Sequence, residues 1–308
     1  MKGYYRVRLG QGGAHADECL ADGFIGTDFG FREDLSRRLP DEVRTFNREF
    51  IPIFLAANPD KTKIGAGLNC SALWTVSKGI KSGDLVLSPD ARGRYHLGEV
   101  SGEYFYAKDD VLPHRRRVSW LGMTVDRADM SEALRHSIGG PGTVVNVTGY
   151  AEEIEALLVG SPAPRLVSTD DSVEDPVAFA MEKHLEDFLV ENWSQTELGS
   201  DYSIFEEEGE RVGQQYPTDT GPIDILAISS DRTRLLVVEL KRGRASDVVV
   251  GQLLRYVGYV QDELAEEGQT VQGAIIAFED DLRLRRALAV VPSVDFYRYE
   301  VTFKLTQG

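Results

Sequence analysis

The chain has 308 residues, 42% of them hydrophobic and 27% charged, which is the composition of a soluble globular protein and favours two domains over one. No run of about 18 apolar residues occurs and the first residues lack the apolar core of a signal peptide, so no membrane association is expected. Two isolated cysteines, Cys19 and Cys70, predict neither a disulfide framework nor a zinc site. A cytoplasmic protein is therefore expected.

The net charge of −16 is divided unevenly along the chain. Residues 1–150 carry 20 Lys and Arg against 19 Asp and Glu, which leaves 14 basic and 31 acidic residues for the rest. Because an acidic surface repels phosphates, a DNA-binding groove in the second half would have to be a local basic feature. The first half is expected to supply most of any DNA affinity.

In the first half, short strands and helices alternate with turns rich in Gly, Pro and Asp. Strands are predicted at YYRVRLG, GDLVLSPD, GRYHLGEVSGEYFYA and RRVSWLGM, and helices at AHADECLADG, EVRTFNREFIPIFLAANP, CSALWTVSKGI, DMSEALRHSI and GYAEEIEALL. Helices packed against a few curved strands indicate a compact α+β, barrel-like domain over residues 1–160.

A stretch rich in Pro, Ser and Asp predicts a linker at 161–177, followed by a second, α/β domain at 178–308. An amphipathic helix is predicted at 178–193, then three strands joined by tight turns, a long helix, a buried strand, a short helix and an edge strand or strand pair. These elements are, from the first strand on, RVGQQYP, GPIDILAIS, LLVVELKRG, ASDVVVGQLLRYVGYVQDELAEEG, VQGAIIAFE, DLRLRRALAV and SVDFYRYEVTFKL. The order is α-β-β-β-α-β-α-β.

Charged residues interrupt two of these strongly apolar strands. Side chains alternate along a strand, so Glu239 and Lys241 project together from the end of LLVVELKRG, opposite in direction to Leu240. If GPIDILAIS pairs with it antiparallel, Asp224 reaches the same place. Two carboxylates this close repel unless a cation lies between them, and oxygen ligands suit Mg²⁺ or Mn²⁺. Lys241 would then help to position or deprotonate a water molecule.

The helix that follows carries a polar face next to this cluster. Gln252, Arg255, Tyr256 and Tyr259 fall at helical spacing, with Gln252 able to bond a water or phosphate and Arg255 able to hold a DNA backbone. The alternative is a simple surface salt bridge between Glu239 and Lys241 with a solvated Asp224. The metal site is favoured because charges on rigid, buried elements tend to mark function.

The spacing ID-x14-ELK in this order of elements resembles the PD-(D/E)XK nuclease superfamily. More closely, HLEDFLVENW, GQQYPTDTGPIDILA, VVELKRGRASDVVVGQLLRYVGYV and GAIIAFEDD resemble the catalytic domain of NucS/EndoMS-type endonucleases and Mrr-like restriction proteins. The resemblance implies a catalytic core of Asp224, Glu239 and Lys241, with Asp224 and Glu239 as the metal ligands.

The same resemblance assigns further residues. Glu186 matches the additional acidic residue, ahead of Glu182, and Gln252 and Tyr256 match a QxxxY motif in which Gln252 is catalytic. Gln215 and Tyr216 match a GRxYP-like stretch as nucleic-acid contacts, although Gln214 stands where that family often has Arg.

The first half resembles, more loosely, PUA-like modules of the EVE type, which read modified bases in DNA or RNA. A flipped base needs an aromatic wall and polar partners for its edge. The candidate nucleic-acid contacts are Trp74, Tyr104, Tyr106, Asp28, Arg115, Arg116 and Arg117. For each of them the alternative is a role in core packing or as a solvated charge.

Together these features predict a metal-dependent DNA endonuclease, a modification-dependent or Mrr-like restriction enzyme in which a reader domain precedes a nuclease domain. The alternatives are a NucS-like repair nuclease acting on mismatched or branched DNA, and a non-catalytic nucleic-acid-binding protein. Cutting both strands favours a homodimer. The terminal sequence VTFKLTQG does not resemble a sliding-clamp peptide, so coupling to a clamp is not expected.

Overall fold

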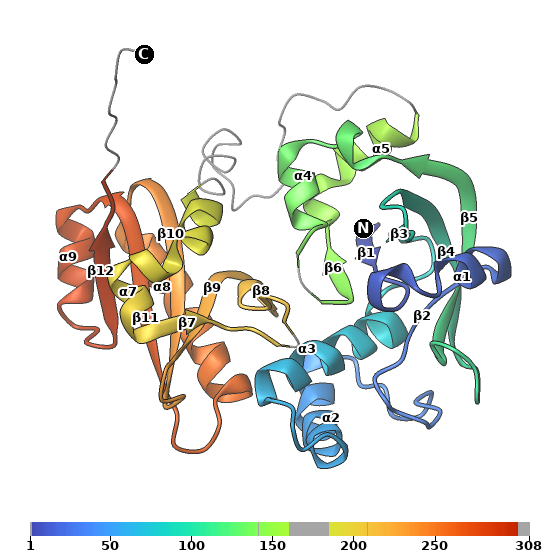
Figure 1. Cartoon of the computed structure of the whole chain (residues 1–308), viewed down its shortest axis with the longest axis horizontal. Helices are drawn as coiled ribbons and strands as arrows, with labels where there is room; N and C mark the ends of the chain where they lie inside the picture. Colours follow the sequence, from blue (N-terminus) through green and yellow to red (C-terminus); the bar gives the residue numbers. More distant parts are fainter. Residues whose placement is uncertain (1, 141, 160–184, 208, 301–308) are drawn as a thin grey trace. The chain divides into compact units, whose positions relative to one another are not determined.

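The computed structural model describes residues 2–140, 142–159, 185–207 and 209–300. The chain divides into two compact units, Met1–Val177 and Ala178–Gly308, and each contains a six-stranded sheet (Figure 1). The predicted linker at 161–177, the first part of the helix predicted at 178–193 and the last part of the predicted edge strand lie outside the described residues. Within the described residues, the helices are all too short or too polar to cross a lipid bilayer.

The sheet of the first unit has the strand order β2-β5-β4-β3-β1-β6. Only β1 and β3 pair in parallel; the other neighbours are antiparallel. The four predicted strands are confirmed, whereas β2 and β6, with four and three residues, are too short to show an apolar period. The strands are β1 (Tyr4–Val7), β2 (Phe24–Thr27), β3 (Leu85–Pro89), β4 (Tyr95–Tyr106), β5 (His114–Val125) and β6 (Val144–Asn146).

Both faces of this sheet are covered. In β3, Leu85 and Leu87 face one core, which α4 and α5 complete, and Val86 faces a second core closed by α1 and the turn 75–79. The other two helices, α2 and α3, form a cluster of their own with Phe31. The helices are α1 (Ala16–Asp22), α2 (Val43–Ala57), α3 (Lys63–Trp74), α4 (Glu132–Ser137) and α5 (Ala151–Leu158), so all five predicted helices are present.

The long strands β4 and β5 bend as they cross the unit, as Figure 1 shows. Their pairing slips in register between His96 and Gly98, and a Cβ atom on Gly98 would lie 2.4 Å from Val118 and 2.7 Å from the Trp120 ring. Glycine is therefore required where the two strands approach most closely. In the described strands the hydrogen-bonded order ends at β2 and β6, so the sheet is open rather than a closed barrel. The PUA/EVE-like assignment remains a prediction.

The second unit follows the predicted order of elements. Its sheet runs β12-β11-β10-β9-β7, with β8 also paired to β9. The short β7 and α7 were not predicted. The elements are a helix at 185–191, α7 (Glu197–Asp201), β7 (Tyr202–Ile204), β8 (Gln214–Thr218), β9 (Gly221–Ser229), β10 (Arg234–Arg244), α8 (Asp247–Tyr259), β11 (Thr270–Glu279), α9 (Leu282–Leu288) and β12 (Val294–Arg298).

The two faces of this sheet differ in what covers them. Leu236, Val238 and Leu240 of β10 join one core with residues from 189–198. The opposite face belongs to α8, because a Cβ atom on Gly273 of β11 would lie 2.9 Å from Leu253 of α8. Since β10, β11 and β12 run parallel, both crossovers, through α8 and then α9, lie on this second face. The carboxyl ends of the three strands meet at one edge of the sheet.

Candidate metal centre in the second unit

The strand register brings the predicted carboxylates together on the α8 face. β9 and β10 are antiparallel with Val238 opposite Ile225, so the next pair along is Glu239 opposite Asp224. The Leu240 amide donates to Asp224 Oδ2 at 2.7 Å, which fixes that carboxylate against β10. Lys241 Nζ donates to Glu239 Oε1 at 2.8 Å. Glu239 is only 1% exposed, so this pair is not the surface salt bridge considered as the alternative.

Glu186 completes a group of three acids. It lies on the helix 185–191 and is 4% exposed. Gln215 Nε2 donates to Glu186 Oε2 at 2.5 Å and to Asp224 Oδ1 at 3.2 Å, so one amide group bridges two carboxylates. Gln214 Nε2 donates to Glu186 Oε1 at 2.8 Å. The two glutamines thus hold Glu186 without adding a positive charge.

Gln215 is held in an uncommon backbone conformation, with φ +51°. Non-glycine residues rarely adopt this left-handed conformation, and they keep it where the surroundings enforce it. Here the conformation goes with an amide that reaches inward to two acids. Gln215, predicted to contact nucleic acid, therefore contacts the acidic cluster instead. Its neighbour Tyr216 is 1% exposed, so the predicted nucleic-acid contact of Tyr216 is corrected to a core role.

The acidic cluster is electrostatically strained. Burial raises the pKa of Asp224 well above its usual value, and the charges of Glu239 and Glu186 raise it further. Lys241 and the Leu240 amide act in the opposite direction but do not cancel the rise. Three carboxylates with one ammonium group carry a formal charge of −2, which one divalent cation would balance. This set of oxygen donors fits a hard cation such as Mg²⁺ or Mn²⁺.

The helix α8 borders the cluster through Gln252 and Tyr256. Tyr256 is 3% exposed, and burial raises its pKa, while a hydrogen bond with Gln252 opposes that rise. The charges of Glu239 and Asp224 also raise the Tyr256 pKa, so the phenol lies within their reach. Being buried, Tyr256 is corrected from a nucleic-acid contact to a residue that positions Gln252. Arg255 is exposed on the same helix.

Two of the three residues in the predicted arginine run of the first unit are buried. Arg115 and Arg116 are 6% and 2% exposed. Arg116 donates to the carbonyl oxygens of Val76 and Ser77 at 2.7 and 2.8 Å, and the Arg115 guanidinium lies 3.8 Å from the Phe24 ring centre. Their phosphate-binding assignment is therefore corrected to a structural one.

Arg117 is the exposed member of the run. Its guanidinium lies 4.8 Å from the centre of the Phe105 ring and donates to the Asp22 carbonyl oxygen at 3.2 Å. It alone of the three keeps the predicted DNA contact as an open prediction. Strand alternation places Arg115 and Arg117 on one face of β5 and Arg116 on the other, so it does not by itself account for the exposure of Arg117. Local packing separates Arg115 from Arg117, since Arg115 lies over Phe24 and donates to the Leu112 carbonyl oxygen.

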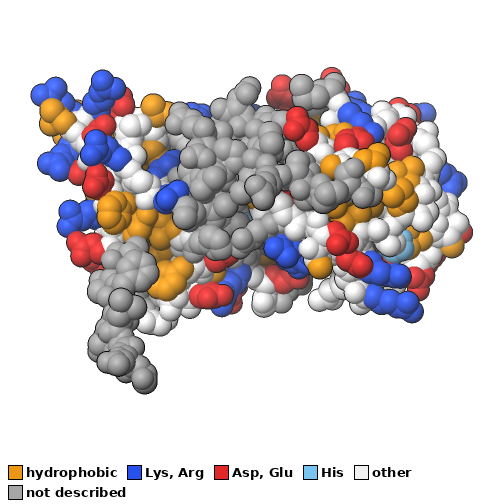
Figure 2. All heavy atoms as spheres, turned by 90° about the horizontal axis from the view of Figure 1, so that it is seen from above, with side chains coloured by type: hydrophobic (Ala, Val, Ile, Leu, Met, Phe, Trp, Pro, Cys, Tyr) orange, Lys and Arg blue, Asp and Glu red, His pale blue; other side chains and the backbone are white. Residues whose placement is uncertain are grey.

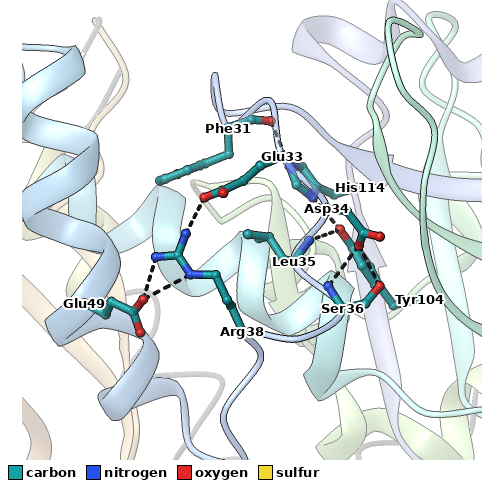
Figure 3. A network of polar contacts seen from close by, with 9 residues as sticks. All are labelled: Phe31, Glu33, Asp34, Leu35, Ser36, Arg38, Glu49, Tyr104 and His114. Carbon is teal, nitrogen blue, oxygen red and sulfur yellow. Dashed lines mark hydrogen bonds and ion pairs between the residues drawn. The ribbon is translucent and has the colours of Figure 1, made fainter.

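The predicted aromatic wall is also engaged in internal contacts. Tyr104 accepts from the Leu35 amide at 3.1 Å and hydrogen-bonds His114 Nδ1 at 3.0 Å, and His114 Nε2 bonds the Phe31 carbonyl oxygen at 3.0 Å (Figure 3). Burial raises the Tyr104 pKa to about 12 and lowers the His114 pKa. His114 was not predicted, and no sequence spacing singles it out.

The remaining candidates of the first unit have structural partners too. Trp74 Nε1 donates to the Pro40 carbonyl oxygen at 2.9 Å. Tyr106 packs with its ring centre 5.3 Å from that of His114. Asp28 pairs with Arg32 at 2.9 Å. Each of these reader-pocket residues therefore has an internal partner, and their base contacts stay predictions.

Two families match parts of this chain. Residues 182–284 match the Endonuclease NucS C-terminal domain, and residues 5–138 match a domain of unknown function, DUF8426. No curated protein sequence matches the chain.

Two solved structures show a partial similarity to this chain, with little sequence in common. One is described as a repair endonuclease from Pyrococcus abyssi, with 15% identity and a TM-score of 0.31 over 67% of this chain and 62% of that one. A second is an EndoMS complex with double-stranded DNA, with 16% identity and a TM-score of 0.31 over 68% of this chain and 62% of that one. The matches therefore span less than two thirds of the length of these structures.

Proposed function

We propose that the NucS-type endonuclease domain carried at residues 182–284 makes this chain a metal-dependent DNA endonuclease with a role in repair. The observation that carries the proposal is the convergence of Asp224, Glu239 and Glu186 beside Lys241, at the strand ends of the second unit. A charge-strained cluster of this kind costs stability, and a purely binding protein has no need of it. That cost speaks against the non-catalytic alternative.

Asp224 and Glu239 would hold the ion, with Glu186 next to it. When bound, a divalent cation activates water and stabilises the charge that develops on a phosphate during hydrolysis. The Leu240 amide orients the Asp224 carboxylate, and the Gln215 amide keeps Glu186 and Asp224 at a fixed separation. These contacts arrange the ligands before any substrate arrives.

Lys241 and Gln252 would act on the substrate side. An ammonium group has three donors, so Lys241 can bond Glu239 and also donate to a water molecule or a phosphate oxygen. Its side chain is 30% exposed, which leaves it accessible from solution. Gln252, held by Tyr256, offers an amide that can orient the attacking water.

Repair is preferred to restriction as the biological role. Restriction was expected from the likeness of the second half to Mrr-like restriction proteins and of the first half to modified-base readers, but the first half matches a domain of unknown function. The NucS domain favours the repair alternative, and the similar structures include a repair endonuclease and a complex with double-stranded DNA. A homodimer is the proposed active form because cutting both strands requires two sites.

The test is a cleavage series with the full chain. Matched, mismatched, branched, single-stranded and methylated DNAs are incubated with Mg²⁺, Mn²⁺ or a chelator, alongside an Asp224→Asn variant. We expect cleavage of mismatched or branched duplexes that needs the metal and Asp224. Cleavage of methylated duplexes alone would return the restriction role, and no metal-dependent cleavage of any DNA would refute the proposal.

A further inference from the structure

The second unit is acidic overall, yet five of its ten arginines gather at one edge. Three of them, Arg283, Arg285 and Arg286, lie on α9, Arg244 ends β10 and Arg298 ends β12. These five residues are called the arginine surface below. Figure 2 shows Lys and Arg side chains, with acidic and hydrophobic ones between them, at the left-hand end of the picture, the side on which α9 and β12 lie in Figure 1.

Strand register places the arginine surface beside the metal centre. Lys241 is level with Ala277 of β11, and Ala277 is level with Arg298 of β12, so all three side chains point to the α8 face. Two strand spacings separate Lys241 from Arg298, which is roughly 10 Å. α9 starts just after the end of β11 and packs against α8. The arginine surface therefore borders the proposed cleavage site.

The members of the surface differ in how far they are neutralised. Arg244 pairs with Glu279 at 3.0 Å and Arg298 with Glu300 at 3.0 Å, and Arg285 pairs with Asp280. Arg283 and Arg286 are exposed, and neither has an ion pair with any other residue that the structure describes. They are three residues apart in the helix, so both project from one side of α9.

An aromatic pair at the same strand ends lies on the other face of the sheet. Phe278 follows Ala277 in β11 and so points away from the α8 face; it is 44% exposed, and its ring centre lies 5.7 Å from that of Tyr299, which packs against the core on that side. Exposed arginines clustered on one face are themselves typical of surfaces that follow a nucleic-acid backbone. An arginine fork also matches the geometry of a phosphate better than an ammonium group does.

We propose that the arginine surface, led by Arg283 and Arg286, binds the phosphate backbone of the DNA strand next to the cleavage site. This inference rests on the proposed nuclease function and adds to it the main contact between the protein and the DNA backbone. It also moves that contact from the first unit, where Arg115 and Arg116 are buried, to the second. A span of roughly 10 Å corresponds to about three base pairs of the DNA axis.

The experiment compares two double charge reversals in the full chain. Arg283→Glu/Arg286→Glu changes the arginine surface. Arg211→Glu/Arg232→Glu makes the same change at two exposed positions away from it, before β8 and in the turn before β10. Affinity for a labelled duplex is measured by fluorescence anisotropy with Ca²⁺, from about 50 to 200 mM salt. Thermal melts and light scattering report folding and assembly.

For the Arg283→Glu/Arg286→Glu variant we expect at least a tenfold loss of affinity at about 0.1 M salt. The slope of log affinity against log salt should fall in magnitude by about 1.8, for two lost phosphate contacts. The control variant should bind like the wild type.

Equal losses in both variants, or no loss in either, would overturn the assignment of the surface while leaving the nuclease proposal standing. A variant that changes the oligomeric state instead would identify a protein interface and also overturn it. A wild-type chain that binds no DNA and cuts none would refute the proposed function itself.

Discussion

Replacing Asp224 by Asn is expected to stabilise the metal-free protein at neutral pH and to abolish its cleavage activity. The substitution keeps the shape of the side chain and an oxygen that can accept from the Leu240 amide. It removes one of three converging carboxylate charges, and with it a ligand of the proposed ion. Stability and activity should therefore change in opposite directions, which ordinary damage to the fold would not produce.

The size of the gain follows from the geometry of the cluster. Opposed residues on paired strands place the Asp224 and Glu239 carboxylates roughly 5 Å apart, which gives a repulsion of about 3 kcal/mol at an effective dielectric constant of about 20. The Gln215 amide, at 2.5 and 3.2 Å from its two acceptors, holds Glu186 at a similar separation and adds a similar repulsion.

Three terms oppose this gain. The attraction between Asp224 and Lys241 offsets about one of the two repulsions. The weaker hydrogen bond from the Leu240 amide to a neutral acceptor takes back about 1 kcal/mol. The Gln215 amide, which donates to Asp224 Oδ1, loses that acceptor to an NH2 group, which takes back about 1 kcal/mol more. The net gain is about 1 kcal/mol, or roughly 3–5 °C in Tm for a unit of this size.

The gain should depend on pH in a defined direction. The pKa of Asp224 is raised in the folded chain from its ordinary 3.8, so the folded state holds this proton more tightly than the unfolded state. Stability is therefore lost as pH rises from about 4 through the folded pKa, and the Asn variant escapes that loss. The Tm difference should be small near pH 4 and reach its full size near pH 8.

The assay is a set of thermal melts in chelator across this pH range, with Asp219→Asn as an exposed control that changes the same charge. Added Mg²⁺ or Mn²⁺ should raise the Tm of the wild type, by about 2.7 kcal/mol of stability at a hundredfold excess over Kd, and should not raise that of the variant. A Tm for Asp224→Asn below the wild type at pH 8, or a gain of equal size at pH 4, would refute this reasoning.

Three further outcomes are expected. Lys241→Arg should lose most of the cleavage rate while its DNA affinity stays nearly unchanged, because guanidinium keeps the charge but cannot give up a proton. Normal cleavage activity would mean that Lys241 serves only as the ion-pair partner of Glu239. Burial lowers the pKa of His114, so the folded state resists its protonation and the stability of the protein should fall as pH drops below about 6.5. In thermal melts His114→Gln should make that fall less steep. An unchanged pH profile would contradict this expectation. Arg116→Ala should lower the free energy of unfolding in denaturant by more than about 2 kcal/mol, because the Val76 and Ser77 carbonyl oxygens lose their donor. DNA affinity should stay intact. A salt-dependent loss of binding would instead support the predicted phosphate contact of Arg116.

Local sequence patterns predicted most of the elements in both units. Short apolar runs located β9, β10 and β11, and helical spacing located α8, with boundaries close to those observed. The elements that were missed, β2, β6, β7 and α7, have three to five residues each. Such elements form because longer neighbours pair with them or pack on them, so their own sequence carries little signal.

The sequence by itself determined the acidic core of the candidate site. Asp224, Glu239 and Lys241 each lie in a strand whose apolar pattern fixes the direction of its side chains, and a tight turn between the two strands leaves few registers possible. The neighbourhood of Glu239 and Lys241 follows from period-two alternation, a local property of the chain, and Asp224 joins them through the antiparallel register of β9 and β10.

Only the tertiary structure decided which polar residues remain accessible. Arg115, Arg116 and Arg117 are consecutive in sequence, but the first two are buried under packed elements and donate to carbonyl oxygens, while the third is exposed. Gln215 likewise points inward because of its left-handed backbone and the position of Glu186 on a distant helix. Burial depends on elements far apart in the chain, so charge and spacing in the sequence could not separate a structural arginine from one that meets DNA.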